Sequence, residues 1–202
     1  MSLSWKQSYR NFETYLRLEK SLSGNSIEAY LNDVSKLENF FLESGTDISP
    51  VNVTYPDLKR FLLWYAENNE NTRTQSRVLS GIRAFYRFLL IEGEISENPS
   101  SLLESPKIGL KLPEVLSIEE IDRMILQIDL SKPGGHRNKA IIETLYGCGL
   151  RVSELVNLRL TDIHYTEEFV VVTGKGDKQR LVPVSKKALK EIDHYKGQGR
   201  QH

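Results

Sequence analysis

Three prolines interrupt the middle of this 202-residue chain and limit how it can fold. The stretch SENPSSLLESPKIGLKLPEVLS, residues 96–117, is rich in serine and contains Pro99, Pro106 and Pro113. Proline removes a backbone donor and disfavours helix at the residue before it, so this stretch is semi-extended. We therefore predict two domains, at 1–100 and 117–202, joined by a linker at 101–116.

Composition limits the class of protein. Hydrophobic residues make up 39% of the chain and charged residues 27%, as in soluble globular proteins. No apolar run approaches the roughly 20 residues that span a bilayer, so we expect no membrane partner. The single cysteine, Cys148, excludes an internal disulfide and favours a reducing cytoplasm. Because His136, His164 and His194 lack metal-ligand spacing, we predict no metal and no other cofactor.

The first 100 residues have the periodicity of helices. Apolar side chains recur at three- and four-residue spacing over residues 4–23, 23–44, 54–69 and 71–93. We expect Asn25 or Ser26 to cap the second of these helices, and Gly93 to end the fourth. Four helices with short connections predict a small bundle.

The second domain mixes helices with strands. Helical spacing recurs over 117–128, 136–149, 147–163 and 185–196. The first of these helices opens with a capping box, Ser117 with Glu120. The stretch FVVVTGKGDKQRLVPV, residues 169–184, is an apolar β-branched run, a Gly-rich turn and a second strand, which predicts a β-hairpin. The fold class is therefore mainly α: a four-helix domain followed by an α+β domain with a hairpin.

The helix predicted over 71–93 has one basic side. At 100° per residue, its four arginines fall within about 120° of one another: Arg73, Arg77, Arg83 and Arg87. A single arginine is most simply solvated, but no acidic residue lies between Thr72 and Ile91 to balance four of them. Such a side favours contact with a phosphate backbone. Because 27 basic and 27 acidic residues give no net charge, that contact would depend on local arrangement.

Arg151 stands at the start of a predicted helix, where a cation is unfavourable by a few tenths of a kcal/mol. One interpretation is structural: Arg151 pairs with Glu154, three residues later. The other is functional: a Gly-flanked turn into a helix is an anion site, and the arginine adds a bidentate donor. The two combine if Glu154 holds the guanidinium while its other N–H groups face a phosphate.

Lys175 lies at the tip of the predicted hairpin, between Gly174 and Gly176. Surface lysines in turns are usually only solvated. However, Lys178 and Arg180 follow, and three cations in six residues could also reach into a nucleic-acid groove. The run is not a phosphate-cradling P-loop, since the G-x-x-x-x-G-K-[ST] pattern before a helix is absent.

Two motifs, GCGLRVSEL and VTGKGDKQRLVPV, together resemble those of tyrosine recombinases of the phage-integrase and Xer type. In that family the first motif carries a catalytic arginine, which matches Arg151, and the hairpin carries a catalytic lysine, which matches Lys175. The segments LSGNSIEAYLNDVSKLENF and RVLSGIRAFYRFLLIEGEISENP are similar to its helical, SAM-like core-binding domain. The resemblance covers essentially the whole chain. With no extra domain expected before Trp5, the layout resembles Xer enzymes more than integrases with an arm-binding domain.

The resemblance implies phosphoryl transfer on double-stranded DNA without a metal. A tyrosine attacks the scissile phosphodiester, forms a 3′-phosphotyrosyl bond and releases a 5′ hydroxyl, which later attacks a partner's phosphotyrosine. Arg151 would stabilise the charge of the phosphorane, supported by Glu154, and Lys175 would protonate the leaving oxygen. The implied partners are a recombination site and further recombinase protomers, which form a tetramer on DNA.

The chain departs from the family pattern after the hairpin. The family's second arginine lies in an H-x-x-R motif, followed by a histidine or tryptophan and then the nucleophilic tyrosine. No histidine here has an arginine three residues later, and all nine tyrosines precede the expected place. We therefore expect a fragment, the core-binding domain and the first part of the catalytic domain, that binds DNA but is inactive alone.

Alternative functions stay open at this point. The chain could be a DNA-binding module without chemistry, such as a truncated regulator that occupies recombination sites. A helical scaffold for protein interaction would explain the bundle, but neither the arginines nor the glycine-flanked lysine. The resemblance does not separate resolution of chromosome dimers from integration of a mobile element.

Overall fold

The computed structural model describes residues 3–68, 71–107, 109 and 112–199, except for the side chains of residues 175, 198 and 199. The chain divides into two compact units, Met1–Lys111 (the first unit) and Leu112–His202 (the second unit). Each unit has its own hydrophobic core.

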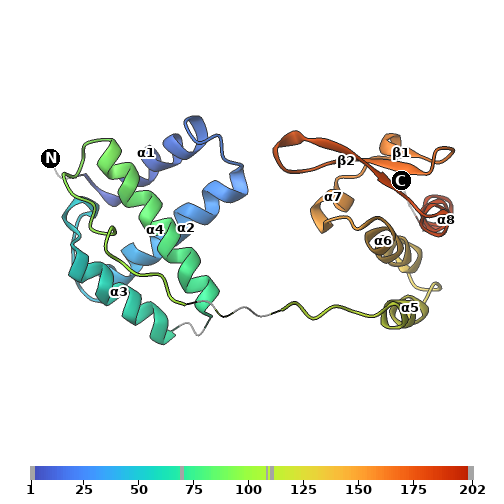
Figure 1. The fold of residues 1–202 in the computed structure, drawn as a ribbon, viewed down its shortest axis with the longest axis horizontal. Coiled ribbons are helices and arrows are strands. Elements are labelled where there is room, and N and C mark those ends of the chain that lie inside the picture. Colours follow the sequence, from blue (N-terminus) through green and yellow to red (C-terminus); the bar gives the residue numbers. More distant parts are fainter. Residues whose placement is uncertain (1–2, 69–70, 108, 110–111, 200–202) are drawn as a thin grey trace. The chain divides into compact units, whose positions relative to one another are not determined.

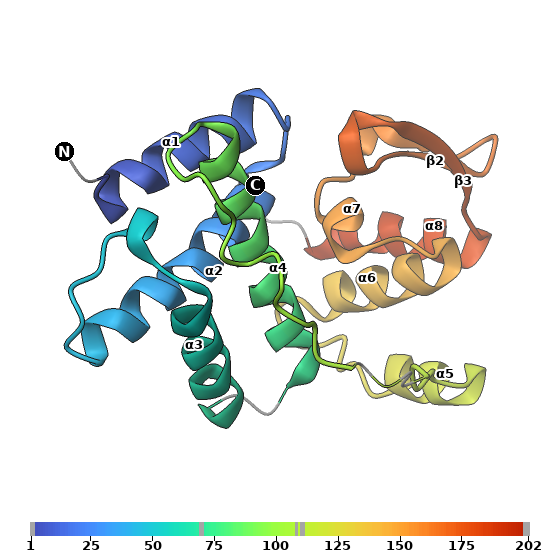
Figure 2. The same cartoon turned by 60° about the vertical axis from the view of Figure 1, so that its left-hand side comes forward.

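Within its described residues, the first unit contains the expected four α-helices and one short 3-10 helix. Their bounds are α1 Trp5–Leu18, α2 Gly24–Glu43, η1 Pro50–Asn52, α3 Tyr55–Asn68 and α4 Thr72–Ile91. Helices α2 and α4 lie side by side in both cartoon views, with α1 and α3 packed against them (Figures 1 and 2). The predicted four-helix domain is confirmed. Helix α2 begins one residue before the expected cap, with Ser23 as its N-cap.

Aromatic side chains fill much of the core of the first unit. The rings of Phe12 and Phe85 meet edge to face at 5.3 Å between centroids, and Phe88 lies 5.3 Å from Phe12. Helices α2 and α4 approach each other tightly at Gly81, where a Cβ atom would lie only 2.6 Å from the Cβ of Asp33. The arginines of α4 are therefore carried on a helix fixed by a dense core.

The start of the predicted linker is part of the first unit. Leu103 is buried in its core. Arg83 of α4 donates one Nη–H to the Ser105 hydroxyl at 3.0 Å and the other to the Leu103 carbonyl. The first unit therefore continues past residue 100, because an apolar side chain and a guanidinium fasten this segment to α4.

Within its described residues, the second unit combines helices with a small antiparallel sheet. The helices are α5 Ile118–Leu126, α6 Gly135–Cys148, α7 Val152–Val156 and α8 Lys186–His194, with short helices η2 Leu160–Asp162, η3 Lys175–Asp177 and η4 Tyr195–Gly199. The strands are β1 Ile163–His164, β2 Phe169–Thr173 and β3 Gln179–Pro183, in the order β1-β2-β3. Buried side chains of β2 pack with those of α8 in one cluster. The predicted hairpin and the mainly α fold class are confirmed.

The region around Arg151 is less helical than its spacing predicts. Helix α6 ends at Cys148, and Gly149 then adopts a left-handed conformation with φ 59°, as glycine does after a helix. Helix α7 has only five residues, and Asn157 ends it. By contrast, the capping box of Ser117 and Glu120 is present as predicted. Across the described residues, we find no helix that is both long and apolar enough to cross a membrane.

Candidate functional site

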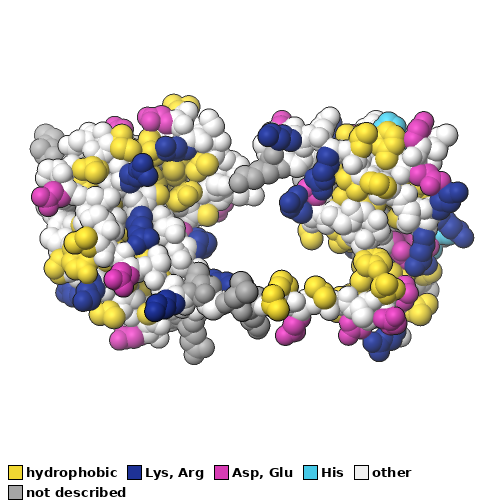
Figure 3. Space-filling view, in the orientation of Figure 1, with side chains coloured by type: hydrophobic (Ala, Val, Ile, Leu, Met, Phe, Trp, Pro, Cys, Tyr) yellow, Lys and Arg dark blue, Asp and Glu magenta, His cyan; other side chains and the backbone are white. Residues whose placement is uncertain are grey.

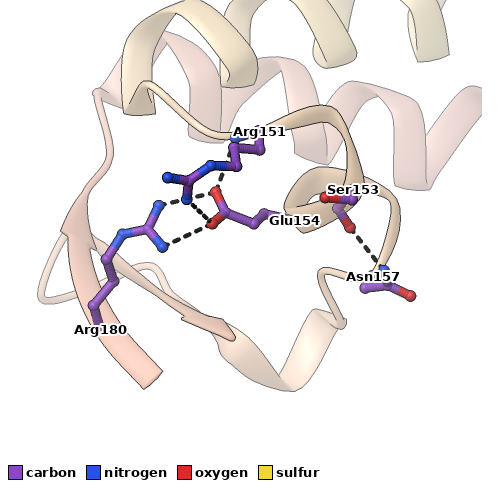
Figure 4. Close-up of polar contacts among 5 residues, drawn as sticks. All are labelled: Arg151, Ser153, Glu154, Asn157 and Arg180. Carbon is purple, nitrogen blue, oxygen red and sulfur yellow. Dashed lines mark hydrogen bonds and ion pairs between the residues drawn. The ribbon is translucent and has the colours of Figure 1, made fainter. Parts of the chain in front are cut away.

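Arg151 is the N-cap of α7, and its extended backbone places its side chain beside Glu154 (Figure 4). Its backbone N–H donates to Glu154 Oε2 at 2.8 Å, and its Nη1 donates to Oε1 at 2.7 Å. These contacts are the pair that the three-residue spacing predicts. Because the Arg151 side chain is 73% exposed, its other N–H groups remain open to a ligand.

Glu154 is buried and also accepts hydrogen bonds from a second arginine. Arg180 of β3 donates from Nη1 to Oε1 at 2.8 Å and from Nη2 to Oε2 at 2.9 Å, a bidentate pair (Figure 4). The Glu154 side chain is only 4% exposed. The hydrogen bond from Arg180 and then that from the Arg151 backbone hold the pKa of this carboxyl far below its ordinary range. Glu154 therefore stays charged between two guanidinium groups.

The loop between β2 and β3 begins at Gly174, beside the ion pair of Glu154 and Arg180. A Cβ atom on Gly174 would lie 3.3 Å from Arg180 Nη1 and 3.6 Å from Glu154 Oε1, so the loop backbone packs against the ion pair. The Gly174 N–H donates to the Lys178 carbonyl at 2.8 Å and closes the loop. Lys175 follows Gly174 directly and opens η3, although its side chain lies outside the described residues. The chain thus brings together, in backbone terms, the arginine and lysine positions predicted from two separate motifs.

The arginines of α4 differ in their surroundings. Arg77 donates to Asp33 of α2 at 2.7 Å, a buried carboxylate that the sequence of α4 alone cannot reveal. Arg83 is held by the Ser105 hydroxyl and the Leu103 carbonyl. Arg73 and Arg87 are exposed at the surface. Of the predicted basic side, these two are the most open to a phosphate backbone, and a DNA contact by any of the four stays a prediction.

Charge of both signs is spread over the molecule. The space-filling view shows Lys and Arg side chains interspersed with Asp and Glu on the visible face of each unit (Figure 3). Among the described residues, no group of three or more His, Cys, Asp or Glu side chains could hold a metal ion. Positive charge open to an anion is therefore local, as at the exposed Arg151 guanidinium.

Comparison with known families assigns both halves of the chain. Residues 10–93 match the family described as phage integrase, N-terminal SAM-like domain. Residues 114–202 match the phage integrase family itself. Both motifs that surround Glu154 lie within the second match.

Curated relatives align along nearly the whole chain. It is 33% identical over 185 residues to tyrosine recombinase XerD of Listeria innocua, covering 92% of this chain and 62% of the relative. It is 39% identical over 189 residues to tyrosine recombinase XerC of Oceanobacillus iheyensis, covering 94% and 62%. The chain thus spans about three fifths of the length of these relatives.

Solved structures share the fold. A lambda integrase dimer bound to a COC′ core site matches with a TM-score of 0.75 at 16% identity, over 98% of this chain and 55% of that one. The Tn1549 transposon integrase in complex with a circular intermediate DNA matches with a TM-score of 0.72 at 15% identity, over 96% and 66%. At such identities the likeness shows the fold alone.

Proposed function

Because the chain belongs to the phage integrase family, the tyrosine recombinases, we propose that it acts in site-specific recombination of double-stranded DNA. The observation that carries the proposal is the arrangement of Arg151. Its guanidinium is oriented by a buried carboxylate, yet most of its N–H groups face solvent. A preoriented, exposed donor of this kind suits a phosphodiester whose negative charge increases during reaction.

The proposed chemistry is strand cleavage and rejoining through a 3′-phosphotyrosyl intermediate. As the tyrosine hydroxyl loses its proton to solvent and its oxygen bonds to phosphorus, the Arg151 guanidinium stabilises the charge on the non-bridging oxygens. The bond to the 5′ oxygen breaks, and Lys175 supplies the proton that this leaving oxygen takes up. Religation reverses these steps, with the 5′ hydroxyl returning its proton to Lys175. Loss of one such charge-stabilising donor typically slows reaction about 10²–10³-fold.

The described residues supply part of this site. The sequence contains no H-x-x-R motif to provide the second arginine, and none of its tyrosines matches the family's nucleophile. We therefore infer that the 202-residue chain binds DNA without cleaving it. The same observation favours the alternative of a DNA-binding module without chemistry. Covalent chemistry by a longer form of the protein would separate the two.

We further propose that the first unit and the hairpin contact the DNA backbone, through Arg73 and Arg87 of α4 and through Lys178. Relatives solved as a dimer on DNA and as a tetramer bound to a Holliday junction support assembly with further protomers on the DNA. Such a protein would work in the cytoplasm, on chromosomal or mobile-element DNA.

Binding and cleavage can be measured separately on the purified chain. Fluorescence anisotropy with a labelled duplex should show affinity that falls with salt, with a slope in log–log form of about −3 or steeper for three or more phosphate contacts. Denaturing gels of the same mixtures should show no DNA-linked protein. Affinity that does not depend on salt, or no binding at all, would overturn the proposal. A covalent adduct would show that a tyrosine already present is the nucleophile.

A further inference from the structure

Glu154 engages its two arginines unequally. Arg180 commits both terminal nitrogens to the carboxylate, one to each oxygen, at 2.8 Å and 2.9 Å. Arg151 commits one terminal nitrogen and its backbone N–H. Arg180 therefore turns the forked end of its guanidinium to an internal partner, whereas Arg151 spends a single side-chain N–H on the same carboxylate. This arrangement gives Arg180 a task different from the DNA contact that its place in a basic run predicts.

The net charge of the cluster formed by Arg151, Glu154 and Arg180 depends on Arg180. One buried carboxylate faces two guanidinium groups, so the three side chains carry a net charge of one positive unit (Figure 4). Among the described residues, Glu154 without Arg180 would keep one guanidinium partner, that of Arg151. Its charge would be cancelled, and its free N–H groups would be drawn to the second carboxylate oxygen. The exposed arginine could then no longer offer a full charge to an anion.

Arg180 also connects the two motifs. It lies on β3 opposite Val172 of β2, so its backbone is part of the hairpin. Its guanidinium reaches Glu154 of α7 and would lie 3.3 Å from a Cβ on Gly174, the residue before Lys175. One side chain thus fixes the start of the lysine-bearing loop relative to the element that carries Arg151.

We propose that Arg180 is a positioning residue that occupies Glu154, so that the Arg151 guanidinium stays free and charged for a phosphate while the β2–β3 loop is held beside it. This inference rests on the proposed function for the identity of the phosphate, a DNA phosphodiester. The electrostatic part of the inference, that Arg180 keeps the Arg151 guanidinium free and charged, can be tested with inorganic phosphate alone.

The test is side-chain NMR of the arginine Nε–H groups in the full 202-residue chain. In the unsubstituted protein, the Arg151 signal should shift on titration with inorganic phosphate. Arg180→Met should weaken that titration on the order of 5- to 10-fold, the scale of coupling within one ion-pair network. Adding Glu154→Gln to Arg180→Met removes the uncompensated carboxylate and should restore most of the phosphate response. Arg180→Lys, which keeps the charge but not the bidentate geometry, should lie between.

Control measurements distinguish an effect of Arg180 on Arg151 from the loss of any cation and from a general loss of structure. Lys186→Met removes one exposed cation from the same unit and should leave the Arg151 titration unchanged. Circular dichroism should show equal helix content in all variants. Without phosphate, the Arg151 Nε–H should exchange more slowly with solvent in Arg180→Met, because that arginine then closes on Glu154.

An Arg151 titration that is unaltered in folded Arg180→Met and Arg180→Lys, or a loss that Glu154→Gln does not restore, would overturn the inference. If the unsubstituted chain shows no phosphate response while Arg180→Met still slows Arg151 exchange, the proposed function fails and the positioning role stands.

Discussion

Replacing Gly81 by alanine tests the close packing of α2 against α4, on which the placement of the arginines of α4 depends. The added Cβ would lie 2.6 Å from the Asp33 Cβ and 2.9 Å from its Oδ2. Non-bonded carbon atoms rest about 3.5–4.0 Å apart. The two helices must therefore separate by about 1 Å, the shortfall from that resting distance, or Asp33 must leave Arg77.

The magnitude follows from two opposing effects. Overpacking a core costs about 1–3 kcal/mol, and this contact belongs near the upper end because both Cβ atoms are attached directly to helix backbones. Alanine regains about 1 kcal/mol of helix propensity over glycine. We expect the free energy of unfolding of the first unit to fall by about 1–2 kcal/mol, which lowers Tm by roughly 5–15 °C in a domain of this size.

Tryptophan fluorescence during thermal and guanidinium unfolding is the direct assay, because both tryptophans, Trp5 and Trp64, lie in the first unit. Gly24→Ala is the matched control: Gly24 is also helical, but a Cβ there meets nothing within 4 Å. That control should stay within about 0.5 kcal/mol of the unsubstituted chain or exceed its stability. Equal stability of Gly81→Ala and Gly24→Ala would refute the close contact of the two helices.

Three further predictions address the domain boundary and the proposed site. Combined substitution of Arg73 and Arg87 by alanine should weaken binding to unrelated duplexes alike and reduce the salt slope by about 2, whereas an unchanged slope would remove α4 from the interface. Trypsin should cut the free chain first after Lys107, which is exposed beyond the segment fastened to α4, and a first cut within α1–α4 would count against the boundary. In a form of the protein that also carries the nucleophilic tyrosine, a 5′-bridging phosphorothiolate should restore cleavage to Lys175→Ala but not to Arg151→Ala, since a sulfur leaving group needs no proton. Equal rescue of both variants would contradict the two assigned roles.

Local sequence patterns predicted those features that depend on neighbouring residues. The pair of Arg151 and Glu154 and the capping box of Ser117 each span three residues, so one helical turn decides them. The four helices and the hairpin follow from periodicity and glycine placement. The five-residue length of α7 did not follow, because apolar spacing persists beyond Asn157 although the helix ends there.

The partners that change the functional interpretation are distant in sequence. Arg180 is 26 residues from Glu154, and Arg77 is 44 residues from Asp33. Each contact forms only when a hairpin or a second helix folds back, and a single sequence contains no periodic signal for it. From the sequence alone, the arginines of α4 and the basic residues of the hairpin are therefore interpreted as free cations. In the structure, Arg77 and Arg180 each pair with a buried carboxylate.

The most direct test of the central claim is an amide NMR titration of the 202-residue chain with a short DNA duplex. If α4 of the first unit and the residues around Glu154 in the second unit each contact DNA, the largest shifts should fall on the exposed side of α4, on residues 150–154 and on residues 174–178. They should also weaken together as salt is raised. Shifts confined to α3 and α5, or absent from residues 150–154 and 174–178 at saturating DNA, would contradict the assignment of Arg151 and Lys175 to a DNA phosphate.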